Sequence, residues 1–147
     1  IGKTTKHVSS ALSPFRADCY TMHQFPARLR SQSTMRKPRR WPAGIELQIK
    51  GDGQRYKFFV RDGATWDSMA YAYSFDTVAD QWITVRVPFA EMIPVRRART
   101  VPDALPLNPG RIYSMQLMLS KFEYDGRLNP QFKAGEFRLF VRTIGTY

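Results

Sequence analysis

The sequence predicts an all-β protein that folds as a β-sandwich or jelly roll. Three observations favour this class. At least six segments alternate apolar and polar residues with the period of a β-strand. Turn-forming residues, mainly glycine, proline, aspartate and asparagine, separate these segments at short spacing. No window of twelve or more residues carries an apolar stripe of helical period.

The first two predicted strands follow each other closely. In "GIELQIK" (44–50) every second residue is aliphatic, and "QRYKFFV" (54–60) repeats the alternation with two aromatic residues and a valine. The "GDG" between them (51–53) is a turn signal. We therefore expect these two strands to form a hairpin.

Four more segments complete the predicted sandwich: "MAYAYSF" (69–75), "QWITVRVPF" (81–89), "IYSMQLML" (112–119) and "EFRLFVRTI" (136–144). Aromatic residues at strand spacing belong to a core more often than to a binding face, so we assign Tyr71 and Tyr73 to the core. The predicted core includes Ile45, Leu47, Ile49, Tyr56, Phe58, Val85, Val87, Leu117, Leu139 and Val141.

The length of 147 residues suits one domain, which we expect to span residues 1–147. Residues 1–43 are polar and interrupted by proline, and we interpret them as an irregular N-terminal region. The segment 90–111 holds four prolines and is expected to be a long loop, after one possible helical turn in "FAEMI" (89–93). No stretch approaches the roughly 18 apolar residues of a membrane-spanning helix.

The chain is strongly basic. Twenty-three Lys and Arg residues face twelve Asp and Glu residues, which gives a formal charge of +11 and a pI of about 10.2. This charge favours nucleic acid, an anionic membrane surface or an acidic protein as partner. The basic residues concentrate at 28–40 and 96–99. The candidate partner-binding residues are Arg96, Arg97, Arg99, Arg36, Lys37, Arg39, Arg40, Trp41, Phe122 and Tyr124.

The sequence offers no catalytic constellation, and we expect no enzymatic activity, no cofactor, no metal and no small-molecule substrate. His7, His23 and Cys19 lack the spacing of a zinc site. Neither a glycine-rich dinucleotide motif nor a P-loop is present. The aspartates and glutamates that could form a glycosidase pair lie mostly in or beside turns, where aspartate is favoured for backbone reasons.

The segment "SKFEYDGRLNP" (120–130) connects two predicted strands and carries two acids, two bases and two aromatic residues. Its charges balance, so we do not expect it to form the main basic surface. "YDG" supplies a turn, "NP" stiffens the exit, and Phe122 or Tyr124 is expected to anchor the segment to the sandwich. A role as a recognition loop stays open.

Four segments of the chain resemble one known family: "GIELQIKGDGQRYKFFVRD", "YSFDTVADQWITVRVPFAEMIPVRRAR", "PLNPGRIYSMQLMLSKFEYDGRLNP" and "GEFRLFVRTIGTY". With a weaker match upstream, the resemblance to the CIA30 family (complex I intermediate-associated protein 30) covers about residues 8–147. It implies a galactose-binding-like β-sandwich and a role as an assembly or stabilising factor of a membrane electron-transfer complex.

The form of "SKFEYDGRLNP" is similar to the branch of this family found in plants and algae. That resemblance implies a chloroplast location, associated with thylakoids, rather than a mitochondrial one. It also keeps open an alternative function, RNA binding in photosystem biogenesis, and a neighbouring Rossmann domain. A carbohydrate-binding module is a third reading, and it rests on fold analogy alone. The partner expected first is an acidic surface of a membrane protein complex.

Overall fold

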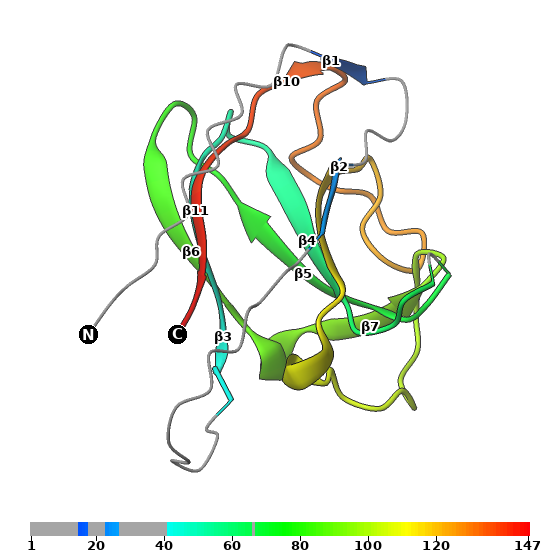
Figure 1. Cartoon of the computed structure of the whole chain (residues 1–147). Helices are drawn as coiled ribbons and strands as arrows, with labels where there is room; N and C mark the ends of the chain where they lie inside the picture. The colour runs from blue at the N-terminus through cyan, green and yellow to red at the C-terminus, as the bar shows by residue number, and fades with distance from the viewer. Residues whose placement is uncertain (1–14, 18–22, 27–40, 66) are drawn as a thin grey trace, which may run out of the picture.

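The computed structural model describes residues 15–17, 23–26, 41–65 and 67–147, and this part of the chain is nearly all β (Figure 1). A three-stranded sheet has the order β11-β3-β6, and a six-stranded sheet has the order β2-β9-β4-β5-β7-β8. A further short pair joins β1 to β10. The strands are β1 (Phe15–Ala17), β2 (His23–Pro26), β3 (Gly44–Lys50), β4 (Arg55–Arg61), β5 (Ala70–Asp76), β6 (Trp82–Pro88), β7 (Ile93–Arg96), β8 (Arg99–Thr100), β9 (Ser114–Leu119), β10 (Gly135–Phe137) and β11 (Phe140–Thr146).

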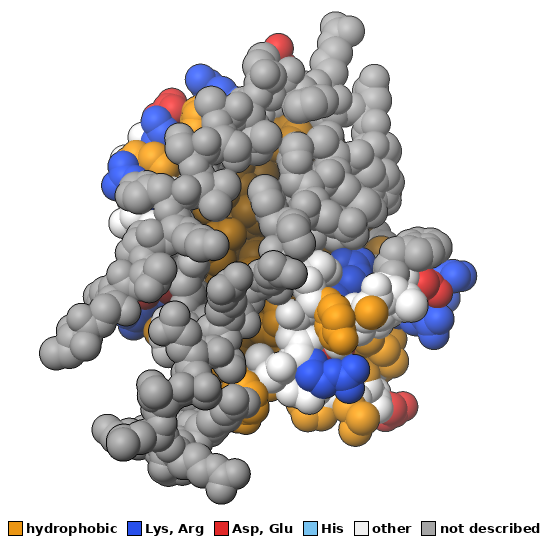
Figure 2. Space-filling model, viewed as in Figure 1, with side chains coloured by type: hydrophobic (Ala, Val, Ile, Leu, Met, Phe, Trp, Pro, Cys, Tyr) orange, Lys and Arg blue, Asp and Glu red, His pale blue; other side chains and the backbone are white. Residues whose placement is uncertain are grey.

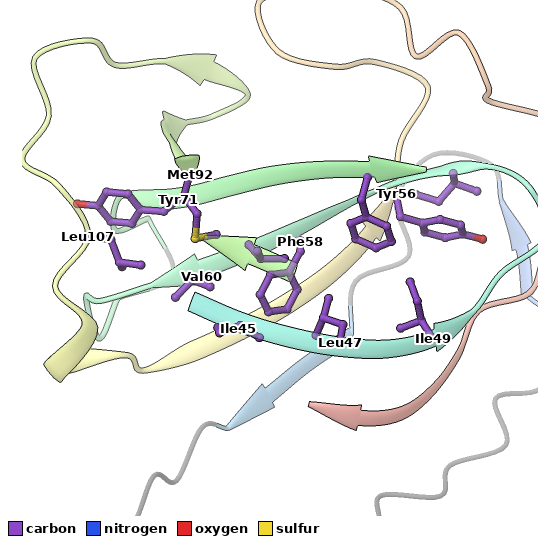
Figure 3. Packing of buried hydrophobic residues seen from close by; sticks show 12 residues of the cluster. Ile45, Leu47, Ile49, Tyr56, Phe58, Val60, Tyr71, Met92 and Leu107 are labelled. Carbon is purple, nitrogen blue, oxygen red and sulfur yellow. The ribbon is translucent and has the colours of Figure 1, made fainter. Parts of the chain in front are cut away.

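The main core lies between the two larger sheets. Ile45, Leu47 and Ile49 of β3 point toward the aromatic side chains of β4, as Figure 3 shows, and all three are at most 2% exposed. The predicted core residues Tyr56, Phe58 and Val87 are equally buried, while Val85, Leu117, Leu139 and Val141 are partly buried and pack against the same cluster. Tyr71 is buried, and Tyr73 is partly buried and packs against the same cluster. The predicted β-sandwich is confirmed; its galactose-binding-like topology stays a prediction.

The expected hairpin of the first two strands is wrong. β3 pairs with β6 and β11, whereas β4 pairs with β5 and β9, so the two strands lie in opposite sheets and face each other across the core. The corner is held by Thr77, whose Oγ1 accepts from Gly53 N at 3.1 Å and donates to Gln54 O at 2.8 Å. A glycine turn has the same residues whether it closes a hairpin or crosses between sheets, so local sequence does not distinguish the two.

Three other expectations change in detail. The predicted strand 136–144 is split into β10 and β11, because Arg138 N donates to Asp52 Oδ2 at 3.0 Å instead of to a neighbouring strand. The expected long loop 90–111 contains β7 and β8, which extend the six-stranded sheet. The expected irregular region 1–43 contributes β1 and β2. The helical turn exists as the 3₁₀ turn η1 (Phe89–Glu91), and a second 3₁₀ turn, η2 (Pro109–Arg111), precedes β9.

Candidate functional site

The outer face of the six-stranded sheet, which points away from the main core, is also apolar. Because side chains alternate along a strand, Phe59 of β4, Ala70 and Ala72 of β5 and Val95 of β7 lie on this outer face. Together with Tyr124 they form a second buried cluster, and Met118 of β9 packs against it. β4 is therefore buried on both sides.

Residues 120–130, called the covering loop here, lie over this second cluster. In Figure 1 the loop follows β9, in orange, and folds back toward the β7–β8 region. Tyr124 is 4% exposed, and its hydroxyl lies 3.1 Å from Ser74 Oγ of β5. The predicted anchoring of the loop by an aromatic residue is thus confirmed for Tyr124, whereas Phe122 is 40% exposed.

A charged network ties the covering loop to the sheet beneath it. Lys57 of β4 is only 4% exposed. Its ammonium group donates a hydrogen bond to the carbonyl oxygen of Phe122 and lies 4.5 Å from the centre of the Tyr124 ring. Glu123 accepts from Arg55 Nε at 3.0 Å and from Ser74 Oγ at 2.8 Å, and its carboxylate lies 3.9 Å from Lys57 Nζ. Buried charges need such partners to offset the loss of hydration.

Burial shifts the pKa values of two groups in this network. Desolvation lowers the pKa of Lys57, because the charged ammonium loses water; Glu123 opposes this shift and Arg55 adds to it. Desolvation raises the pKa of Tyr124 to about 12, since the neutral phenol is the form that tolerates burial. Both pKa shifts show that the outer face of the six-stranded sheet is shielded from water here, although the loop that covers it has a polar sequence.

The covering loop also holds residues 96–99, called the Arg hairpin here. Asp125 N donates to Ala98 O at 3.1 Å, and the Asp125 carboxylate accepts from Thr100 N and Thr100 Oγ1, each at 2.9 Å. The hydrogen bond from the Thr100 backbone is the largest cause that lowers the pKa of Asp125. The two segments that the sequence offers as alternative recognition loops therefore form one continuous surface.

The Arg hairpin has a strained turn. Arg97 and Ala98 have φ values of 50° and 61°, the left-handed conformation that a two-residue type I′ turn requires and that normally selects Asn and Gly. Arg96 and Arg97 both bind the Asp67 carboxylate, at 3.0 and 3.2 Å, and hydrogen bonds from both lower its pKa. Arg96 is the last residue of β7 and Arg99 the first residue of β8, so the expectation that residues 90–111 form a loop is wrong for these two residues.

A pocket of about 310 Å³ lies between the covering loop, the Arg hairpin and the outer face of the sheet. Its walls include Lys57, Phe59, Arg61, Gln116, Met118 and Tyr124. Figure 2 shows Lys and Arg side chains mixed with hydrophobic ones on the lower right of the molecule, where Figure 1 draws β7.

The other predicted partner-binding residues lie elsewhere. Trp41 is 51% exposed, and its ring lies against Gly110 of η2. Arg36, Lys37, Arg39 and Arg40 lie outside the described residues. The polar residues of the outer face that line the pocket, chiefly Lys57, Arg61 and Gln116, were not predicted from the sequence. A signal was available, because Phe59 and Met118 place large apolar side chains at the outward positions of two strands.

Within the described residues no group of three or more His, Cys, Asp or Glu side chains gathers as a metal site requires. In the same part of the chain, no helix has the length and apolar character needed to cross a membrane.

A family model for Complex I intermediate-associated protein 30 (CIA30) matches residues 27–141, which include strands β3 to β10, the Arg hairpin and the covering loop. The chain belongs to the CIA30 family. A comparison with individual curated proteins found no match. Membership of CIA30, an assembly-factor family named after intermediates of complex I, supports a general assembly role with protein partners and an organellar location.

Proposed function

We propose that this CIA30 chain is a noncatalytic assembly or scaffold module that docks on an organellar membrane electron-transfer complex through the Arg hairpin. The observation that carries the proposal is the fixed presentation of this hairpin. Its backbone is held by Asp125 and its arginines by Asp67, yet the side chains of Arg96 and Arg97 remain 57% and 73% exposed. Preorganised side chains lose little conformational entropy on binding.

The charges of the hairpin define the partner's chemistry. Arg96 and Arg97 share one carboxylate, and Arg99 is exposed beside them, so the surface keeps an excess of positive charge. The planar guanidinium group suits bidentate contacts with carboxylates. An acidic patch on a protein subunit is therefore the docking partner that we propose.

We place the client in the chloroplast, at the thylakoid, with a photosystem as the first candidate and respiratory complex I as the second. The support is the form of "SKFEYDGRLNP", which is similar to the plant and algal branch, and the structural role of this segment as the covering loop. The two compartments give different client subunits, so the same capture experiment separates them.

The test is chemical crosslinking of the purified chain in organelle extract, with identification of captured subunits by mass spectrometry. An Arg97→Glu/Arg99→Glu variant should capture the client several-fold less at low salt, because like charges then face each other. Arg86→Glu is the matched control: Arg86 is similarly exposed and paired with one acid, Glu46, but it lies on the other sheet. Equal capture by the double variant and the wild type would exclude the Arg hairpin as the docking surface.

A second candidate function, binding of single-stranded RNA, is favoured by a different face. On the outer face of the three-stranded sheet, three cations lie over exposed aromatic rings: Arg142 over Trp82 at 4.1 Å, Lys50 over Phe140 at 5.1 Å and Arg86 over Tyr147 at 5.3 Å. Aromatic rings and cations on an open sheet suit base stacking and phosphate contacts.

RNA binding is tested with fluorescent single-stranded oligonucleotides at several salt concentrations. Trp82→Ala should weaken binding by about 1–3 kcal/mol if a base stacks on that ring. The Arg97→Glu/Arg99→Glu variant serves as control, since its substitutions lie on the other sheet. If the affinity of the Trp82→Ala variant equals that of the wild type, the open sheet is not an RNA platform.

A further inference from the structure

The pocket between the covering loop and the Arg hairpin contains polar groups that the protein itself does not satisfy. Arg61 Nε and Gln116 Nε2 are buried and have no hydrogen-bond partner among the described residues. Both residues line the pocket, and Gln116 is only 2% exposed. Unsatisfied buried donors are rare in folded proteins, because each costs about 1–3 kcal/mol. We propose that this pocket binds a small organic carboxylate with an apolar body.

Arg61 supplies the positive charge. Within the described residues its one side-chain hydrogen bond goes to Gln116 Oε1, at 3.1 Å, and it forms no ion pair with an acid. The guanidinium group is partly buried, and this desolvation lowers its pKa. A carboxylate bound beside Arg61 compensates the charge and accepts two parallel hydrogen bonds.

Gln116 adds a donor whose direction is fixed. A guanidinium group can only donate, so the oxygen of the Gln116 amide must face Arg61, and the amide nitrogen must point elsewhere. That nitrogen is the unpartnered one. The two unpartnered atoms, Arg61 Nε and Gln116 Nε2, are therefore both donors, which matches an anion that only accepts.

The apolar part of the lining favours an organic carboxylate over a phosphate. The two acids of the wall, Asp67 and Glu123, are already bound by Arg96, Arg97 and Arg55, so Arg61 is the one cation of the described lining that lacks an acid. Phe59, Val95 and Met118 give the pocket an apolar wall, and about 310 Å³ is the lower end of the range for small-molecule sites.

The inference does not rest on the proposed docking function. The pocket proposal uses Arg61 of β4 and Gln116 of β9, whereas the docking proposal uses the exposed side chains of Arg99 and of Arg97, which also lines the rim of the pocket. Loss of client capture in a hairpin variant and loss of ligand binding in a pocket variant are separate results, so either proposal can fail alone.

The experiment titrates the purified chain with phenylacetate and, in parallel, with phenylacetamide, its uncharged analogue, and follows amide shifts by NMR. Phenylacetate should shift resonances of β4 and β9, and phenylacetamide should bind at least tenfold more weakly. Arg61→Gln should weaken phenylacetate binding at least tenfold. Arg86→Gln, the same change on the three-stranded sheet, should leave it unchanged. A second arm uses N-acetylphenylalanine and its amide, to distinguish a free acid from a peptide C-terminus.

Gln116→Glu provides an opposite readout. The new carboxylate lies within reach of Arg61 and imitates the ligand, so the variant should melt at a higher temperature and lose phenylacetate binding. The proposal is overturned if phenylacetate and phenylacetamide bind equally, if neither binds at millimolar concentration, or if the Gln116→Glu variant binds phenylacetate as the wild type does.

Discussion

The outer faces of the two sheets carry similar residues, but one face is buried under a loop and the other is exposed to solvent. On the six-stranded sheet, the covering loop buries Phe59, Lys57 and Tyr124 under a network of charges. On the three-stranded sheet, Trp82 and Tyr147 stay 40% and 39% exposed, with arginines over their rings. Aromatic and basic side chains are thus compatible with interior and surface alike. The difference is whether another segment of the chain covers them.

The largest expected effect is the contrast between two tyrosines. Tyr124→Ala should cost about 3–5 kcal/mol, because it removes a buried aromatic ring and leaves a cavity under the covering loop. Tyr147→Ala should cost less than about 1 kcal/mol, since its ring is partly in water already. Urea unfolding of both variants measures the contrast. Equal losses would mean that the covering loop does not form a second core.

How much of this contrast the sequence predicts depends on the distance over which contacts form. The alternation in β3 and β4 identifies six core residues correctly, because strand periodicity is local. The partners of these strands are distant in sequence, and the residues of "GDG" carry no information about which sheet follows. Hence the hairpin prediction failed although both strands were predicted.

The candidate site was less predictable for a related reason. The sequence identifies Tyr124 and the Arg hairpin, but the contact between Asp125 and Thr100 joins segments that are 25 residues apart. Lys57 reads as a solvent-exposed residue on the polar side of its strand. Only the covering loop makes it a buried one, and no local pattern around Lys57 contains that information.

The second expected effect concerns the charges under the covering loop. Glu123→Gln should cost about 3 kcal/mol, because Lys57 then stays buried without its acid. Adding Lys57→Met to this variant should recover more than half of the loss, since an apolar side chain of similar length needs no ionic partner. Denaturant unfolding of the single and double variants provides the measurement. If the double variant is less stable than Glu123→Gln alone, Lys57 stabilises the loop chiefly through its hydrogen bond to the carbonyl of Phe122.

The third prediction uses pH. The pKa of Tyr124 is raised from 10.0 to about 12 in the folded protein, so its contribution is complete below pH 10 and is lost as pH rises toward 12. The loss amounts to about 2–3 kcal/mol at the upper end. Burial also raises the pKa of Tyr56, so this residue too makes the protein less stable as pH rises. Burial lowers the pKa of Lys57, so this residue has the opposite effect on stability. Its contribution to the free energy of unfolding increases as pH rises toward 10.5.

Unfolding experiments between about pH 9 and pH 12 test this sign. The stability of the wild type should fall across this range, and Tyr124→Phe should reduce the slope, because phenylalanine has no proton to lose. A slope that is the same in Tyr124→Phe and the wild type would show that the Tyr124 hydroxyl is accessible to solvent when the protein is folded.

The smallest expected effect is a gain in stability at the Arg hairpin. Ala98 has a φ of 61°, a conformation that costs a residue with a side chain about 1–2 kcal/mol and costs glycine nothing. Glycine loses more backbone entropy on folding, so Ala98→Gly should stabilise the protein by roughly 0.5–1 kcal/mol net. Ala72→Gly, in the middle of β5 under the covering loop, is the control and should destabilise it. If the Ala98→Gly gain is present and client capture is unchanged, the strained turn does not contribute to docking. If capture weakens while stability rises, the strain holds Arg97 and Arg99 in the orientation that the client requires.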